Sequence, residues 1–164
     1  PLVLGKPNEW ERYYSEKLGD DDLMLVCSPT LLANNQELSV IELVEQNNTI
    51  GVFNPRRKHD WQVWCDHYQV PMPGFHSNLT FDVSIQAVQA AIRSLGVLVT
   101  HRLFVKDDIS HGMLVELGEP VANPHQDFYF VCPKNKLKQE SVLQLRTWLR
   151  HEFANSDMTL NDRT

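Results

Sequence analysis

Two polar side chains stand where an apolar run gives way to a helical pattern, at a place suited to anion binding. Asp82 and Ser84 come directly after Phe81 and before a helical stripe. In open α/β sheets, ligands bind where strands end and helices begin, and either side chain could cap the helix. The free N–H groups at a helix N-terminus favour a carboxylate or another anion. The segment therefore predicts either a ligand site or a plain helix cap, and the residues alone leave both open.

Tyr129 is a second candidate for ligand contact. It lies on a late predicted strand and carries a phenol hydroxyl on an apolar ring. Such a residue either packs in a core or presents its polar tip to a ligand. Its position in the sequence leaves both interpretations open.

Other chemistry has less support. Five residues that could ligate a metal lie close together, but on a helix they point in directions that do not converge: His59, Asp60, Cys65, Asp66 and His67. A solvated helix face is the simpler interpretation. The run Asp20 to Asp22 lacks the spaced ligands of a calcium loop and predicts a solvated turn before a strand. No GxGxxG, GxxxxGK[ST] or GxSxG motif occurs. We therefore predict no enzyme activity, no metal site and no cofactor.

Composition excludes further classes. Fifteen Lys and Arg against 21 Asp and Glu give a net charge of -6, which a DNA duplex repels. The three cysteines have no CxxC spacing, which favours small buried side chains in a reducing cytoplasm over a disulfide framework. No apolar run is long enough to cross a membrane, and the opening residues are too short for a signal peptide core. They are typical of the end of a buried strand, so we expect that preceding residues have been lost.

The elements that would position these residues alternate along the chain. Apolar runs bounded by Pro, Gly or Asn alternate with helical patterns, which predicts an α/β sheet with helices on its faces. A capping box at Ser39 and Glu42 marks the start of one helix. The predicted strands are 1–5, 23–27, 49–53, 76–81, 97–99, 113–117 and 128–132, and the other helices are 60–68, 84–95 and 140–153.

Three helices have apolar stripes that should face a core. On the first, Trp61 and Trp64 share a face with Cys65 and Tyr68, so both indoles should be mostly buried. The inward positions of the second are Ile85, Val88, Ala91, Ile92 and Leu95. Those of the C-terminal helix are Val142, Leu145, Trp148, Leu149 and Phe153.

A series of segments in order along nearly the whole chain resembles the effector-binding domain of LysR-type transcription regulators. The resemblance is closest to the subgroup of glycine-cleavage and β-lactamase regulators. The segments are Leu4-Gly5 followed by Trp10, LMLVCSPTLL at 23–32, Trp61 with Trp64, FDVSIQAVQAAIRSLGVLV at 81–99, FVKDDISHGMLVEL at 104–117, and FYFVCPKNKLKQESVLQLRTWLRHEF at 128–153.

The resemblance implies a two-lobed, periplasmic-binding-protein-like fold of type II. Residues 1–27 would be a remnant of the first lobe, 28–116 the second lobe, and 117–164 the return to the first lobe. The N-terminal part of the first lobe and the DNA-binding helix-turn-helix would be absent. The chain would therefore cross twice between lobes and should not bind DNA by itself.

The resemblance also implies a small-molecule effector in a cleft between the lobes, and an anion is one candidate class. The implied contacts are Gly5 on the loop after the first strand, Asp82 and Ser84 at the helix start, and Tyr129 on the returning strand. The family's usual Arg-Tyr-Gly is Val3-Leu4-Gly5 here, and its usual glycine near Ser94 is missing. These departures alter the cleft rim, so the effector cannot be taken from a relative.

The implied function is ligand sensing in a bacterial regulator that forms homo-oligomers and reaches promoter DNA through its N-terminal domain. Two other classes remain open. A solute-binding protein for transport shares the fold but would need a signal peptide. An enzyme would need a nucleophile, base or metal constellation.

Overall fold

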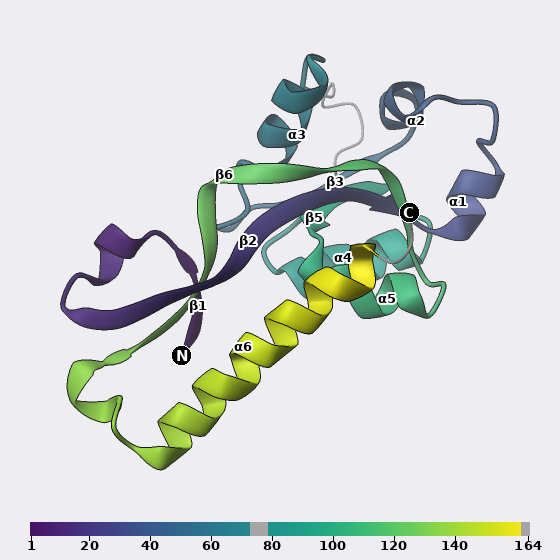
Figure 1. Cartoon of the computed structure of the whole chain (residues 1–164). Coiled ribbons are helices and arrows are strands. Elements are labelled where there is room, and N and C mark those ends of the chain that lie inside the picture. Colours follow the sequence, from purple (N-terminus) through teal and green to yellow (C-terminus); the bar gives the residue numbers. More distant parts are fainter. Residues whose placement is uncertain (73–78, 162–164) are drawn as a thin grey trace. The chain divides into compact units, whose positions relative to one another are not determined.

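The chain divides into two compact units (Figure 1). A computed structural model describes residues 1–72 and 79–161, with side chains to Asn155. Unit 1 comprises Pro1–Asp21 and Asn123–Thr164, and unit 2 comprises Asp22–Ala122. Both boundaries fall inside long strands. The lobe division at residues 28 and 117 that the resemblance implies stays a prediction.

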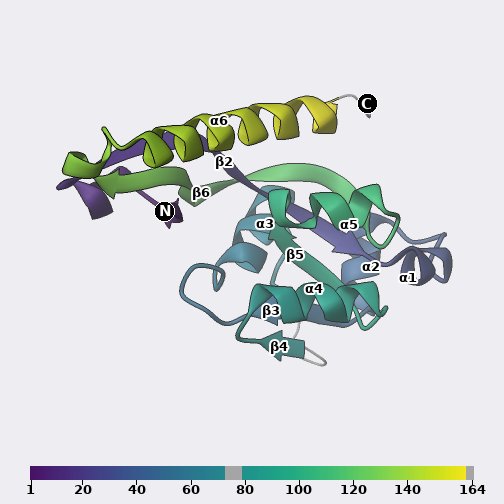
Figure 2. The ribbon, with the colours of Figure 1, turned by 90° about the horizontal axis from the view of Figure 1, so that it is seen from below.

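Unit 1 is a small sheet covered by one long helix. Its strand β1 pairs antiparallel with β6, so that Val3 lies opposite Tyr129 and Gly5 opposite Asp127. The helix α6 packs through Leu149 and Val142 on a cluster that contains Phe130, and Figure 2 shows it lying along the strands of this unit. The elements are β1 (Leu2–Gly5), η1 (Pro7–Trp10), the first part of β2 (Tyr13–Cys27), the last part of β6 (Val115–Pro133), η3 (Lys134–Lys136) and α6 (Glu140–Asn161).

Unit 2 is a sheet with helices on both faces. Its strand order is β2-β5-β3-β4, in which β2 and β5 are antiparallel and β3 is parallel to both β5 and β4. Besides β2 and β6 its elements are α1 (Pro29–Ala33), α2 (Val40–Gln46), β3 (Thr49–Val52), α3 (Asp60–Tyr68), β4 (Leu79–Phe81), α4 (Ser84–Ile92), β5 (Val97–His101), η2 (Leu103–Val105) and α5 (Lys106–Ser110). Of the predicted strand at 76–81, residues 76–78 lie outside the described residues.

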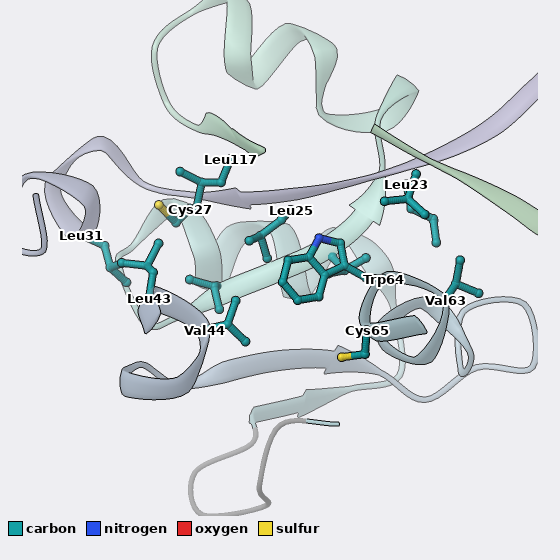
Figure 3. Packing of buried hydrophobic residues seen from close by; sticks show 13 residues of the cluster. Leu23, Leu25, Cys27, Leu31, Leu43, Val44, Val63, Trp64, Cys65 and Leu117 are labelled. Atoms are coloured by element: carbon teal, nitrogen blue, oxygen red, sulfur yellow. The ribbon is translucent and has the colours of Figure 1, made fainter. Parts of the chain in front are cut away.

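Two apolar cores occupy the two faces of this sheet. On one face α4 buries Ala87, Val88, Ala90 and Ala91 against Ile50 and Leu98, and Figure 2 shows α4 beside β3 and β5. On the other face α2 and α3 pack on β2 and β5, with the Trp64 indole in the middle of the cluster (Figure 3). Trp64 is fully buried and Trp61 partly so, which confirms the prediction for both indoles.

The strands β2 and β6 are longer than the sequence predicts. The two predicted strands at 113–117 and 128–132 form one strand, Val115–Pro133, although Pro120 and Pro124 lie inside it. The β1–β6 ladder covers only Asp127–Phe130. Both prolines therefore lie outside this ladder, where a missing N–H removes no bond to β1.

The aspartate run at 20–22 is not the solvated turn that was predicted. All three residues lie within β2, and Asp21 is 1% exposed. Its Oδ2 accepts hydrogen bonds from Asn123 Nδ2 at 3.0 Å and from Gln126 Nε2 at 3.1 Å. Amide donors from β6 thus compensate the burial of a carboxylate, which sequence reading could not anticipate.

Two predicted helix faces need correction. The helix at 84–95 ends at Ile92, Ser94 takes the left-handed conformation at φ 63°, and Ile85 and Leu95 are exposed. On α6, Leu145 and Trp148 are exposed as well, at 45% and 57%. The helix buries a narrower stripe than was predicted, because a single small sheet contacts only one side of it.

Candidate functional site

The unit 1 candidates, Gly5 and Tyr129, belong to one small cluster around Trp10. The β1–β6 register places Tyr129 opposite Val3, two residues before Gly5. Tyr129 is 7% exposed, and its ring centroid lies 5.5 Å from that of the partly buried Trp10. The pairing of β1 with β6 and the loop after β1 together assemble an aromatic wall.

The packing of Trp10 requires a residue without a side chain at position 5. A Cβ atom at Gly5 would lie 2.7 Å from Cη2 of Trp10 and 2.9 Å from Oε1 of Glu9, so the indole occupies the space that a side chain would need. The short helix η1 holds the indole there, because Glu9 Oε1 accepts a hydrogen bond from the Lys6 backbone N–H at 3.2 Å. Sequence reasoning used Trp10 only as part of a family segment and missed its contact with both candidates.

Charged groups border the same strand pair. Asp127, opposite Gly5 in the register, forms an ion pair with Lys17 at 3.3 Å, and Lys17 also contacts Asp20 at 2.7 Å. The hydrogen bond to Asp20 raises the pKa of the Lys17 ammonium above its ordinary value. The cation keeps the two carboxylates in place on β2 and β6.

The unit 2 candidates, Asp82 and Ser84, lie at the start of α4 after β4. Neither side chain caps the helix: the N-cap is Val83 in an extended conformation, without a side-chain cap, and Ser84 is the first helical residue. Of the two possibilities that the sequence left open, a helix cap by Ser84 or Asp82 is therefore not observed. The Ser84 side chain is partly buried and Asp82 is exposed. The helix start keeps the partial positive charge of a helix N-terminus without a side-chain oxygen to neutralise it.

Asn54 joins this helix start to the neighbouring loop. Its Nδ2 donates to the Asp82 carbonyl oxygen at 3.4 Å, and its Oδ1 accepts from the Arg56 N–H at 3.0 Å. The Phe53 N–H donates to the Phe81 carbonyl at 2.8 Å. The loops after β3 and β4 are thus tied together at the carboxyl ends of two parallel strands. The only sequence signal for Asn54 was the Asn-Pro pair that ends a predicted strand.

The cysteines are buried and free, as predicted. Burial raises the pKa of Cys27 to about 11 and that of Cys65 to about 11, so neither thiol ionises readily near neutral pH. Among the residues described, no three His, Cys, Asp or Glu side chains gather in a way that could hold a metal ion. None of the described helices combines the length and apolar character needed to cross a membrane.

The structure brings the candidates together in pairs. Gly5 and Tyr129 both lie against Trp10 in unit 1, and Asp82 and Ser84 lie at the start of α4 in unit 2. The first pair lies on the paired strands β1 and β6, beside the ion pair of Lys17 and Asp127. The second pair follows the end of β4, beside Asn54. That the pairs form one site stays a prediction.

Comparison with known proteins identifies the family. Residues 2–154 match the LysR substrate binding domain, and the chain belongs to this family. It is similar to the glycine cleavage system transcriptional activator of Escherichia coli, with 25% identity over 153 residues that cover 93% of this chain and 49% of that protein. A glycine cleavage activator homolog of Haemophilus influenzae is 23% identical over 140 residues, covering 85% of this chain and 45% of the homolog.

Solved structures show the same fold. A triply substituted effector binding domain from Citrobacter freundii superposes with a TM-score of 0.74 at 16% identity, covering 93% of this chain and 73% of that one. The effector domain of the regulator AmpR of Pseudomonas aeruginosa gives 0.73 at 17% identity, covering 97% and 74%. The α/β fold is therefore the type II periplasmic-binding-protein-like fold, as predicted.

The family distinguishes a regulatory domain from a transport protein. The relatives are transcriptional regulators, which favours a regulatory domain over a transport protein and over an enzyme. The chain spans about half the length of the curated relatives it matches, at 45% and 49%.

Proposed function

We propose that this chain is the ligand-sensing part of a bacterial LysR-type transcription regulator. The observation that carries the proposal is the family match over residues 2–154. The full-length protein would bind a small-molecule effector, and this binding would control transcription. Relatives that span about twice this length are named as transcriptional regulators, two of them of the HTH type.

The effector would contact both pairs of candidate residues. Ser84 and Asp82 would supply the start of α4, where backbone N–H groups and the helix dipole attract an anion. Tyr129 and Gly5 would supply the strand pair of unit 1. The uncapped helix start supports this assignment, because no side-chain oxygen of α4 occupies the position that a ligand oxygen would take. We infer a small anionic effector.

The whole protein would act on DNA through another part of its chain. With 15 basic against 21 acidic residues, this part has no electrostatic basis for binding a duplex. Promoter binding would come from an N-terminal helix-turn-helix domain, in a homo-oligomer, in the bacterial cytoplasm. No cofactor is needed for sensing by this mechanism.

Substitutions at the two hydroxyl groups test the site in the full-length regulator. Ser84→Ala and Tyr129→Phe each remove one oxygen and keep the carbon framework. The Ser84 hydroxyl does not cap α4, so its removal should leave the helix intact. Each of the two substitutions should reduce effector-dependent transcription by roughly tenfold, the cost of one hydrogen bond to a charged group. Promoter occupancy should stay unchanged. Ser141→Ala, on an exposed position of α6, is the matched control.

The readouts are a promoter–reporter fusion and chromatin immunoprecipitation of the same strains. A wild-type response from both Ser84→Ala and Tyr129→Phe would exclude the proposed contacts. Loss of promoter occupancy would instead indicate damage to folding.

A further inference from the structure

We propose that unit 2 holds a second small-molecule site, which takes a small carboxylic acid with an apolar body. The site is a cavity of about 220 Å³ between the sheet and the start of α3. It lies wholly within unit 2 and contains neither Ser84 nor Asp82. Its lining includes Gly51, Phe53, Arg57, Lys58, Asp60 and Trp61.

The floor of the cavity is open because Gly51 has no side chain. A Cβ built at Gly51 meets no atom within 4 Å. Neighbouring strand residues point to opposite faces, and both Ile50 and Val52 belong to the core under α4. Gly51 therefore faces away from α4, toward α3, so the cavity and the start of α4 lie on opposite faces of the sheet.

One end of the cavity carries a buried ion pair. Arg57 is 3% exposed and Asp60 is 5% exposed, and Arg57 Nη1 lies 3.2 Å from Asp60 Oδ2. Asp60 neutralises one of the two cationic side chains in the lining, and the exposed Lys58 leaves one positive charge in excess. The lining therefore carries one net positive charge, which would attract a carboxylate.

The remaining walls are apolar and unusually accessible. Phe53 is 73% exposed and Met72 is 41% exposed, and both line the cavity. The Trp61 indole forms another wall, and it is held in place because its Nε1–H donates to the Ile50 carbonyl at 2.8 Å. Exposed apolar side chains around a cavity are typical of ligand sites.

The size of the cavity limits the ligand. Pockets for drug-sized ligands measure roughly 300–1,000 Å³, and this cavity is smaller, at about 220 Å³. A single ring or a short branched chain with one carboxylate matches both its volume and its charge. Asp82 and Ser84, the effector contacts proposed in the same unit, are not part of its lining.

Benzoate is a suitable probe, and isothermal titration calorimetry on the intact protein measures its binding. Gly51→Val fills the floor with a side chain that suits a strand, and should weaken benzoate binding by at least roughly tenfold through lost volume. Gly51→Ala should have a smaller effect in the same direction. Ser141→Ala, at an exposed position of α6, is the control and should leave benzoate binding unchanged. Ser84→Ala reports any binding of benzoate at the start of α4. Benzamide, which has the same shape without the charge, should bind roughly tenfold more weakly than benzoate.

Each outcome of these measurements either supports or overturns the proposed site. Weaker binding in both Gly51 variants, with normal far-UV circular dichroism, supports the site. Unchanged binding in Gly51→Val, equal binding of benzamide, or no benzoate binding by the wild type would overturn the proposal. Binding that is lost in Ser84→Ala and kept in Gly51→Val would place benzoate at the start of α4 instead.

Discussion

Individual residues show how much local chemistry a sequence reveals. Burial of the three cysteines followed from their spacing, and it is observed. The sequence left open whether Ser84 caps α4, because the cap depends on the backbone conformation of Val83, which sequence does not display. The contact of Trp10 with Tyr129 was missed because it joins residues far apart in the chain. Residue types were readable, whereas their partners were not.

We expect substitution by alanine to have opposite effects on stability at two glycines that lie on strands. Gly5→Ala should destabilise the chain by about 1–3 kcal/mol, because the new methyl group meets the Trp10 indole in a packed region. Gly51→Ala should stabilise it by roughly 0.5 kcal/mol or leave it unchanged, because its methyl group meets open space and alanine restricts the unfolded chain. Urea unfolding of both variants measures this difference. Equal destabilisation would contradict the packing described for Gly5.

At the scale of elements, periodic patterns predicted what local sequence can determine. The helix α3 runs from Asp60 to Tyr68, with the predicted bounds, and α2 begins with the predicted capping box. The continuity of β6 was missed because Pro120 and Pro124 are normally strand breakers. The outward side of α6 was misread because an apolar residue indicates burial only if a neighbouring element covers it.

Two tryptophans on helices test this distinction. Trp64→Ala should cost about 3–5 kcal/mol of unfolding free energy, because the indole is fully buried in the core of unit 2. Trp148→Ala should change it by no more than roughly 0.5 kcal/mol, because the indole is 57% exposed. Thermal or denaturant unfolding of the two variants provides the comparison. A large loss for Trp148→Ala would mean that another part of the protein covers α6.

For the whole molecule, alternation of elements predicted the fold class but not the strand order. The order β1-β6-β2-β5-β3-β4 brings together strands from opposite ends of the chain, and such pairing leaves no periodic signal in the sequence. The resemblance to LysR-type regulators supplied the two-lobed arrangement, and the family match confirms the fold. The candidate site came from the same resemblance and stays a proposal.

Net charge makes a prediction for the chain as a whole. Because it carries a charge of -6, the 164-residue chain should not bind duplex DNA. An electrophoretic mobility shift with the regulator's own promoter, at about physiological salt, checks this. The full-length protein is the positive control. A retarded band with the isolated chain would show that these residues contribute to DNA binding.

Effector sensing is the central claim, and a reporter measurement tests it most directly. A strain carries the full-length gene and a reporter on the promoter it controls, and it grows on an array of carbon and nitrogen sources. We expect at least one small anionic compound to change reporter activity, and deletion of the codons for residues 1–164 to abolish that change. A response that persists after the deletion, or no response to any compound, would contradict the assignment of this chain as the sensor.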